Sequence, residues 1–495
     1  MGSAMFSRVI GLVRVKYIAW LLGRSAAADA FNAAFQLPDM LLYFLVGGAA
    51  SITVVTMLSR YRESGREADG DRDISVILTT VVLVLSVAIL IAEFATPWYV
   101  RLWFNGFSPE KVALCTLLTR IVLPTPICFF VGGVFGARLL THRIFSVQAV
   151  APLIYNGSMI VGGVILGRMV GVSSLAIGAM AGGICGPLLL NAAGALRIGM
   201  RFRPALDWTN PGLREYVRMS LPLMLGVSLV QADTWIINHY ASQIGGAISL
   251  LAYAKQMFNA PISLGQAAGS ASLPFLASLY HREDRKLFER SVNSSVSQLV
   301  SFSLLLSAFL TAMAFPIADV LLRGGALKRD DAHTTALYLA IFSFSLFLWS
   351  TQPIFARAFF AAGDMMTPMV ASTIFTFATL PVYPALYRLM GPAGLAVASD
   401  IGILFQTLVL ALLLHRRGMV SLSGLEYGEM GRALLVSLIS GSLLAGTAHV
   451  FQSANRLWEC SLLAGAVLAW FVVSLVLLRA LGSAIPDRLM AKLRR

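Results

Sequence analysis

The chain has 495 residues, of which 57% are hydrophobic and only 13% are charged, and its mean hydropathy is +0.77. Soluble globular chains contain about 25% charged residues, so this composition excludes an ordinary soluble enzyme and favours a polytopic membrane protein. A net charge of +14 would suggest nucleic acid binding in a soluble chain, but in a membrane protein it must first be compared with the charge of the loops.

Long apolar stretches follow one another along the whole chain. A membrane-spanning helix needs about 20 predominantly apolar residues. The stretches that meet this requirement are joined by short connections, which leave no room for a soluble domain. We therefore predict an all-α polytopic membrane protein with 14 transmembrane helices, whose spans begin near residues 6, 29, 74, 112, 147, 173, 215, 248, 291, 335, 366, 392, 430 and 457.

The first two predicted spans carry a concentration of charge. Arg8, Arg14 and Lys16 lie in the first span, and Asp29 and Asp39 lie in the second. Ionisable groups at bilayer depth are costly, so they normally face a partner or a water-filled cavity. Because a guanidinium group suits phosphate or carboxylate, we expect these cations to bind an anion, with Lys16 and Asp39 as accessory residues.

Ionisable residues also occur inside later predicted spans. They are Glu93, Arg120, Asp233, Lys255 and Asp400. We expect Lys255 to add positive charge to the anion site, with Asp233 as an accessory residue. The alternative is that the embedded charges form structural ion pairs, for example Arg14 with Asp29 or Lys255 with Asp233.

An internal repeat divides the chain. Residues 31–62 and 254–282 share the same order of features: a proline, a run of small residues and then a basic loop. The repeat predicts two pseudo-symmetric six-helix lobes, at residues 1–205 and 206–418, followed by a C-terminal helix pair and basic tail at 419–495. Proline and glycine free backbone groups that can rearrange inside a protein cavity, so we expect hinges at Pro38, Gly47, Gly48, Pro261 and Gly265.

The loops differ in charge between the two predicted sides of the membrane. One side holds 24 Lys and Arg residues and the other holds nine. The excess of Lys and Arg in cytoplasmic loops predicts that both termini are cytoplasmic. Because this asymmetry accounts for most of the net charge, we expect no nucleic acid partner. The four cysteines form no CxxC pair, which is typical of core packing rather than of a disulfide or metal site.

Motifs for catalysis or metal binding are missing from the sequence. There is no HExxH, no GxSxG, no P-loop and no histidine cluster. We therefore expect a transporter rather than an enzyme, without a metal or other cofactor. The energy for transport would come from the membrane potential, from a monovalent ion or from the flux of the substrate itself.

Four segments resemble one known family. MFSRVIGLVR (5–14), ADAFNAAFQLPD (28–39), IFSVQAVAPLIYNGSMI (144–160) and FFAAGDMMTP (359–368) are similar to the MviN/MurJ lipid II flippases of the multidrug/oligosaccharidyl-lipid/polysaccharide exporter superfamily. The resemblance covers nearly the whole chain, and the first and third segments are the most specific.

The resemblance implies two six-helix lobes around a cationic cavity, with a groove for a lipid tail in the last helix pair. It also implies alternating access and transfer of undecaprenyl-pyrophosphate-linked peptidoglycan precursor, lipid II, to the periplasmic leaflet of the bacterial inner membrane. The family's cavity residues correspond to Arg8, Arg14 and Asp29, and a family arginine in the eighth span corresponds to Lys255. Membrane lipids and envelope-synthesis proteins are the further partners expected.

The sequence departs from the family at several charged positions. Val15 replaces an acid, Leu42 and Tyr43 replace an arginine pair, and Gly47 and Ala254 also stand where acids are often found. These losses leave alternatives open: another polyprenyl-linked glycan as the substrate, a cation-coupled drug antiporter, or a scaffold for envelope synthesis that transports nothing.

Overall fold

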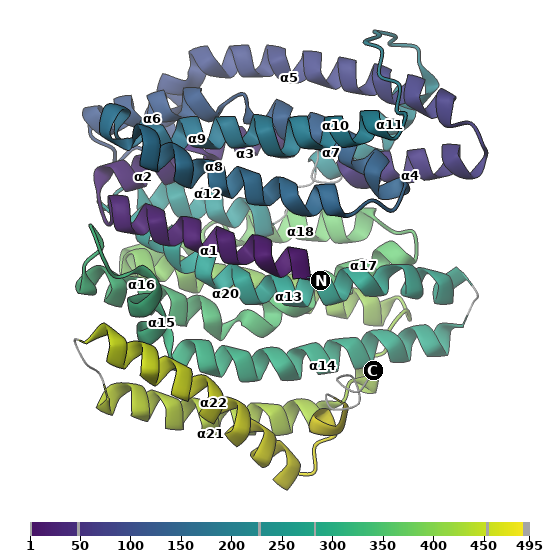
Figure 1. The fold of residues 1–495 in the computed structure, drawn as a ribbon. Coiled ribbons are helices and arrows are strands. Elements are labelled where there is room, and N and C mark those ends of the chain that lie inside the picture. The colour runs from purple at the N-terminus through teal and green to yellow at the C-terminus, as the bar shows by residue number, and fades with distance from the viewer. Residues whose placement is uncertain (1, 47–49, 226–228, 282–283, 452–454, 489–495) are drawn as a thin grey trace. The chain divides into compact units, whose positions relative to one another are not determined.

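The computed structural model describes residues 2–46, 50–225, 229–281, 284–451 and 455–488. Within these ranges, the side chains of 2–8, 46, 50–52, 222–225, 229–230, 263–275, 277–278, 281 and 456 are not described. The regular structure of the described residues is helical, with one isolated bridge between Gly324 and Leu327 (Figure 1). The predicted all-α class is therefore confirmed.

The chain divides into two compact units. The first contains Met1–Gly226 and Ser242–Ser249. Its helices are α1 (Gly2–Leu22), α2 (Ala26–Ala34), α3 (Gln36–Val46), α4 (Ala50–Glu63), α5 (Glu67–Trp103), α6 (Pro109–Val122), α7 (Thr125–Thr141), α8 (Ser146–Val170), α9 (Ser173–Gly183), a π-helical turn (Ile184–Leu190), α10 (Asn191–Arg197) and α11 (Pro211–Leu225).

The second unit contains Val227–Ala241 and Leu250–Arg495. Its helices are α12 (Leu229–Ala241), α13 (Ala247–His281, whose first turn belongs to the first unit), α14 (Arg285–Ala312), α15 (Ala314–Leu322), α16 (Arg329–Phe344), α17 (Leu346–Ala361), α18 (Met366–Thr379), α19 (Val382–Met390), α20 (Pro392–Arg416), a short 3₁₀ turn (Leu422–Gly424), α21 (Tyr427–Val450) and α22 (Arg456–Ala480). The lobe boundaries at residues 205 and 418 and the pseudo-symmetry stay predictions.

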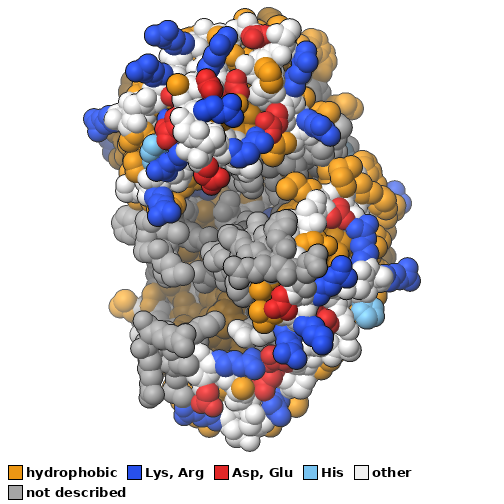
Figure 2. All heavy atoms as spheres, turned by 90° about the vertical axis from the view of Figure 1, so that its right-hand side faces the viewer, with side chains coloured by type: hydrophobic (Ala, Val, Ile, Leu, Met, Phe, Trp, Pro, Cys, Tyr) orange, Lys and Arg blue, Asp and Glu red, His pale blue; other side chains and the backbone are white. Residues whose placement is uncertain are grey.

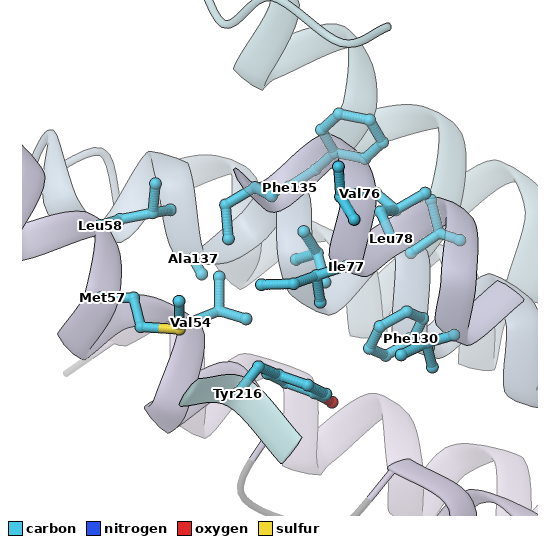
Figure 3. Close-up of a cluster of buried hydrophobic side chains, with 14 of the residues drawn as sticks. Val54, Met57, Leu58, Val76, Ile77, Leu78, Phe130, Phe135, Ala137 and Tyr216 are labelled. Atoms are coloured by element: carbon cyan, nitrogen blue, oxygen red, sulfur yellow. The ribbon is translucent and has the colours of Figure 1, made fainter. Parts of the chain in front are cut away.

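Each unit has its own apolar core. In the first unit, Met57 of α4, Ile77 of α5, Phe135 of α7 and Tyr216 of α11 belong to one buried cluster (Figure 3). The second unit has a separate cluster with side chains from α13, α14, α17 and α20. Because lipid is as apolar as these side chains, close packing rather than escape from water holds such helices together.

Large apolar side chains also lie on the outside of the helices. Phe94, Trp98 and Leu102 on α5, and Leu457 and Leu468 on α22, are exposed. Contiguous exposed apolar surface of this kind is unfavourable in water and is typical of membrane contact. A helix satisfies its own backbone hydrogen bonds, so these surfaces are suited to hydrocarbon.

The described residues contain eight helical segments long and apolar enough to cross a membrane, or ten when each of two bent helix pairs counts as one span. These ten correspond to ten of the predicted spans. The other four predicted spans, which begin near residues 6, 29, 215 and 248, each include residues whose side chains are not described. The exact count of 14 therefore stays a prediction.

Basic side chains gather at the ends of several helices. In the first unit, Arg60, Arg62 and Arg66 surround the turn between α4 and α5, and all three are exposed. Figure 2 shows Lys and Arg side chains, interspersed with acids, on the described surface at this end of the helices. Arg60 pairs with Glu215 of α11, and the buried Arg138 of α7 pairs with Glu67 of α5 at 2.7 Å. These ion pairs join the helix ends of the first unit.

Candidate functional site

Arg14 is a cation at membrane depth that has no carboxylate partner among the described residues. It lies on α1, which packs along α8, and its side chain is half-buried. Its Nη1 atom is 3.9 Å from the sulfur of Met159 on α8, and its buried Nε atom has no hydrogen-bond acceptor within the described ranges. A guanidinium with unused donors in this position is suited to an anionic ligand.

Tyr155 has two ionisable neighbours in the first unit. Tyr155 of α8 is within electrostatic range of both Arg14 and Asp39, and its ring packs edge-on against Phe129 of α7 with centroids 5.1 Å apart. The Asp39 side chain, in the first turn of α3, is exposed. Positive, negative and hydroxyl groups therefore approach one region of the first unit.

Asp29 is fully buried at the start of α2, where three donors surround its carboxylate. Its carboxylate binds Lys111 Nζ of α6 at 2.6 Å and accepts hydrogen bonds from the backbone amides of Gly246 and Ser249, at 2.7 and 2.9 Å. Both amides belong to the first unit and lie at the start of α13. The pair of Asp29 with Arg14, which the sequence left open as an alternative, does not form in this structure, because these three donors occupy the carboxylate.

Lys111 is a residue of this network that the charge pattern of the sequence did not single out. Ser108 caps α6 and Pro109 occupies its first turn, a combination that marks a helix start. That signal was sufficient to place Lys111 on a helix. Its ammonium group lies 4.2 Å from the centroid of the Phe107 ring, a cation–π contact that further stabilises the buried charge.

Lys255 lies in the second unit and is neutralised there. Its ammonium group forms an ion pair with the fully buried Asp233 of α12 and donates to the Thr234 hydroxyl at 2.8 Å. The hydroxyl of Tyr383 on α19 donates to the other oxygen of Asp233 at 2.7 Å. This is the structural ion pair considered as the alternative in the sequence analysis. A contribution of Lys255 to substrate binding stays a prediction, and it requires the pair to open.

The remaining predicted residues divide into those that the structure describes and those that it does not. Lys16 is half-buried on α1, Pro38 is buried on α3, and Pro261 is half-buried on α13. The hinge role of the two prolines stays a prediction. Arg8 and Gly265 lie within helices, but their side chains are not described. Gly47 and Gly48 lie outside the described residues.

Apolar packing occupies positions where the resembled family carries charge. Val15 is buried on α1. Leu42 on α3 packs against the core cluster of the first unit, and the neighbouring Tyr43 stacks edge-on with Phe44 at a centroid separation of 5.4 Å. In this chain these positions stabilise the helix packing instead of adding charge to the site.

The last two helices of the second unit enclose an apolar groove. Its volume is about 440 Å³, and its walls come from α21 and α22. The residues that line it include Leu443, Leu444, Phe451, Trp458, Leu462 and Trp470. Such a groove is suited to a hydrocarbon chain.

Comparison with known proteins identifies the family. The family described as lipid II flippase MurJ matches residues 18–473. The chain belongs to this family. A relative from Buchnera aphidicola, named probable lipid II flippase MurJ, is 26% identical, with 91% of this chain and 89% of the relative covered. The lipid II flippase MurJ of Burkholderia cenocepacia is 27% identical, with 84% and 83% covered.

Solved structures support the same fold. A lipid II flippase MurJ in an inward closed conformation has a TM-score of 0.79 at 21% identity, with 97% of this chain and 98% of that chain covered. An inward-facing MATE family transporter of the MOP superfamily has a TM-score of 0.68 at 14% identity, with 90% and 99% covered. The chain is therefore a multi-pass transporter of the bacterial inner membrane and not an enzyme, as the sequence predicted.

Proposed function

We propose that this chain translocates lipid II from the cytoplasmic to the periplasmic leaflet by alternating access. The family match over residues 18–473 supports the substrate. The structural observation that carries the proposal is Arg14, a membrane-depth guanidinium with an unused buried donor among the described residues. A pyrophosphate offers several acceptor oxygens, and the planar fork of arginine binds such groups with two parallel hydrogen bonds.

The arrangement around Arg14 favours an anion that arrives and then leaves. No described carboxylate pairs with Arg14, so within the described part of the chain the pyrophosphate has no ion pair to displace there. Asp39 lies within electrostatic range of Tyr155, which in turn lies near Arg14, and an ionised Asp39 would weaken the hold of Arg14 on the bound anion. Arg8, which precedes Arg14 by six residues on α1, is the further cation that we propose for this site.

The tail of the substrate needs a separate apolar path. We propose that the groove between α21 and α22 holds part of the polyprenyl chain, because its lining is almost entirely hydrocarbon and aromatic. Because the tail enters the groove from bilayer hydrocarbon, it gains affinity through close packing rather than through escape from water.

The charge of the substrate also gives transport a direction. With both termini in the cytoplasm, as we propose from the loop charges, a pyrophosphate leaves a negative interior for a positive exterior. Movement of one uncompensated charge across 100 mV is worth about 2.3 kcal/mol. We propose the membrane potential, with or without a monovalent ion, as the driving force, and the basic cytoplasmic loops as the surface available to envelope-synthesis proteins.

Complementation tests the proposal directly. In a bacterial strain depleted of its own lipid II flippase, the wild-type chain should restore growth, and lipid II should become accessible to a degrading enzyme added outside the inner membrane. Arg14→Ala should abolish both effects, and Arg14→Lys should restore them only in part because lysine lacks the fork.

A matched control comes from Arg101, an exposed arginine in the last turn of α5. Arg101→Ala should behave as the wild type. All variants must be present in the membrane in equal amounts, as measured by immunoblot. Failure of the well-expressed wild type to restore growth would favour the scaffold alternative. Full activity of Arg14→Ala would remove Arg14 from the mechanism.

A further inference from the structure

The second unit contains a second pocket, separate from the groove between α21 and α22. Its volume is about 510 Å³, within the range of about 300–1,000 Å³ that is usual for small-molecule sites. Its walls come from α14, α16, α17 and α20, and its lining consists of apolar side chains with Thr311, Ser345 and Asp400 as the polar members.

Asp400 is the one ionisable side chain among the described residues that line this apolar pocket. Its side chain, on α20, forms no ion pair with any described residue, and its Oδ1 accepts a hydrogen bond from the Ser345 hydroxyl. Asp233, the acid within electrostatic range of Asp400, is already paired with Lys255. The carboxylate in the pocket thus lacks the compensating cation that acids at membrane depth normally have.

A break in the helix holds this carboxylate in position. Ser345 separates α16 from α17, which are bent by 44° relative to each other. The hydroxyl of Ser307 on α14 donates to the carbonyl oxygen of Ser343, which satisfies a backbone group at the break. The Thr311 hydroxyl contacts the carbonyl of Ala340 at 3.4 Å. The polar groups at the base of the pocket are therefore engaged with the backbone, except for the carboxylate.

The chemistry of the walls selects the kind of cation. A small metal ion prefers several oxygen ligands, but this lining offers few oxygens and a large apolar area. Phe344 and Phe347 line the pocket, and Phe344 is 72% exposed. Aromatic faces attract organic cations. The ionisable acid, the volume and the apolar walls together fit a cation with a hydrophobic body.

We infer that the pocket formed by α14, α16, α17 and α20 is a binding site for a hydrophobic organic monocation, with Asp400 as its counter-ion. The inference is independent of the proposed transport of lipid II, because it uses no residue of the Arg14 site or of the α21–α22 groove.

Binding of tetraphenylphosphonium to the purified full-length chain tests this inference. The wild type should bind one equivalent, and Asp400→Asn should weaken binding by about 30-fold or more, as expected for loss of one partner from a desolvated charge pair. Ala340→Phe keeps the carboxylate but fills the pocket, and it should weaken binding to a similar extent. Asp330→Asn removes an exposed carboxylate from the first turn of α16 and should leave binding unchanged.

A neutral probe of similar shape separates charge from folding. If Asp400 acts as counter-ion, Asp400→Asn should bind neutral tetraphenylmethane as the wild type does, in detergent that dissolves it. Wild-type affinity for tetraphenylphosphonium in both Asp400→Asn and Ala340→Phe would overturn the inference. Equal losses for the charged and the neutral probe in Asp400→Asn would also overturn it, because the carboxylate would then act only through the shape of the pocket.

Discussion

Arg14 and Lys255 are both cations at membrane depth, but their surroundings give them different properties. Asp233, Thr234 and Tyr383 form a closed network with Lys255. Arg14 has a sulfur contact and an unused donor within the described part of the chain. An anion that binds Arg14 displaces no carboxylate, whereas an anion that binds Lys255 must compete with Asp233.

The Lys255–Asp233 pair leads to a prediction for stability. Lys255→Met leaves the fully buried Asp233 without its cation, and a broken buried pair costs about 3–5 kcal/mol. We expect a clear fall in the thermal unfolding midpoint of the purified protein. The double variant Lys255→Met with Asp233→Asn should recover most of the loss. A double variant as unstable as the single one would show that the pair is not the source of the effect.

Residue partners were only partly predictable from sequence. The Lys255–Asp233 pair could be named as a candidate ion pair, because the two residues lie in neighbouring predicted spans of one lobe. The Asp29 network was not foreseen, since it depends on backbone amides of Gly246 and Ser249, more than two hundred positions away, that no side-chain pattern reveals. The apolar role of Leu42 likewise depends on packing between distant helices.

Helices α8 and α9 approach each other through glycines. A Cβ atom on Gly178 would lie 2.5 Å from the carbonyl oxygen of Ser158, and one on Gly182 would lie 2.8 Å from that of Tyr155. Small residues permit such close approach of helices in membranes. Because Tyr155 and Met159 lie on the same helix as these contacts, the α8–α9 packing also supports the surroundings of Arg14.

Gly178→Ala should therefore destabilise the protein. The added methyl group collides with backbone rather than with a flexible side chain, and overpacking of this kind costs about 1–3 kcal/mol. Gly157→Ala is a matched control on α8, because a Cβ there meets nothing within 4 Å. Thermal unfolding should show a loss for the first variant only. An equal response of both variants would mean that helix propensity, and not close packing, decides stability here.

Asp364 fixes the start of α18 outside the membrane-spanning segments. Partial burial acts to raise the pKa of Asp364, but hydrogen bonds from the Thr367 hydroxyl and amide, together with Arg417, outweigh it and lower the pKa below its usual value. The amide bond measures 2.9 Å and the hydroxyl bond 2.6 Å. The folded protein therefore favours the ionised carboxylate.

This lowered pKa predicts how stability depends on pH. The contribution of Asp364 is present above the pKa of the unfolded chain and is lost as the pH falls through the lower pKa of the folded protein. Asp364→Asn keeps an acceptor for the Thr367 amide but removes the charge that pairs with Arg417, so it should cost up to about 1 kcal/mol at neutral pH. Unfolding midpoints measured from pH 7 to acid should converge for the two proteins. A constant difference at every pH would exclude ionisation as the cause.

For the molecule as a whole, composition and helix length were enough to predict the class and ten of the spans. Hydropathy detects these spans because each carries a long apolar run, as in α5 and α20. Hydropathy does not locate the break at Ser345. There the Ser307 hydroxyl of α14 donates to the carbonyl of Ser343, and the Ser345 hydroxyl donates to the Asp400 carboxylate of α20. Without a Pro or Gly at position 345, the sequence has no local signal for it.

The proposed orientation leads to a prediction for the whole molecule. Ser64 and Asn105 are exposed at opposite ends of the long helix α5, so a single cysteine at each position reports a different side of the membrane. Cys185 and Cys460, which are exposed, are first replaced by alanine. If the loop charges set the topology, a membrane-impermeant maleimide should label Asn105→Cys, but not Ser64→Cys, in cells with a permeabilised outer membrane. Inside-out vesicles should give the opposite result. The reverse pattern in both preparations would place the termini in the periplasm and would show that the loop charges do not set the topology.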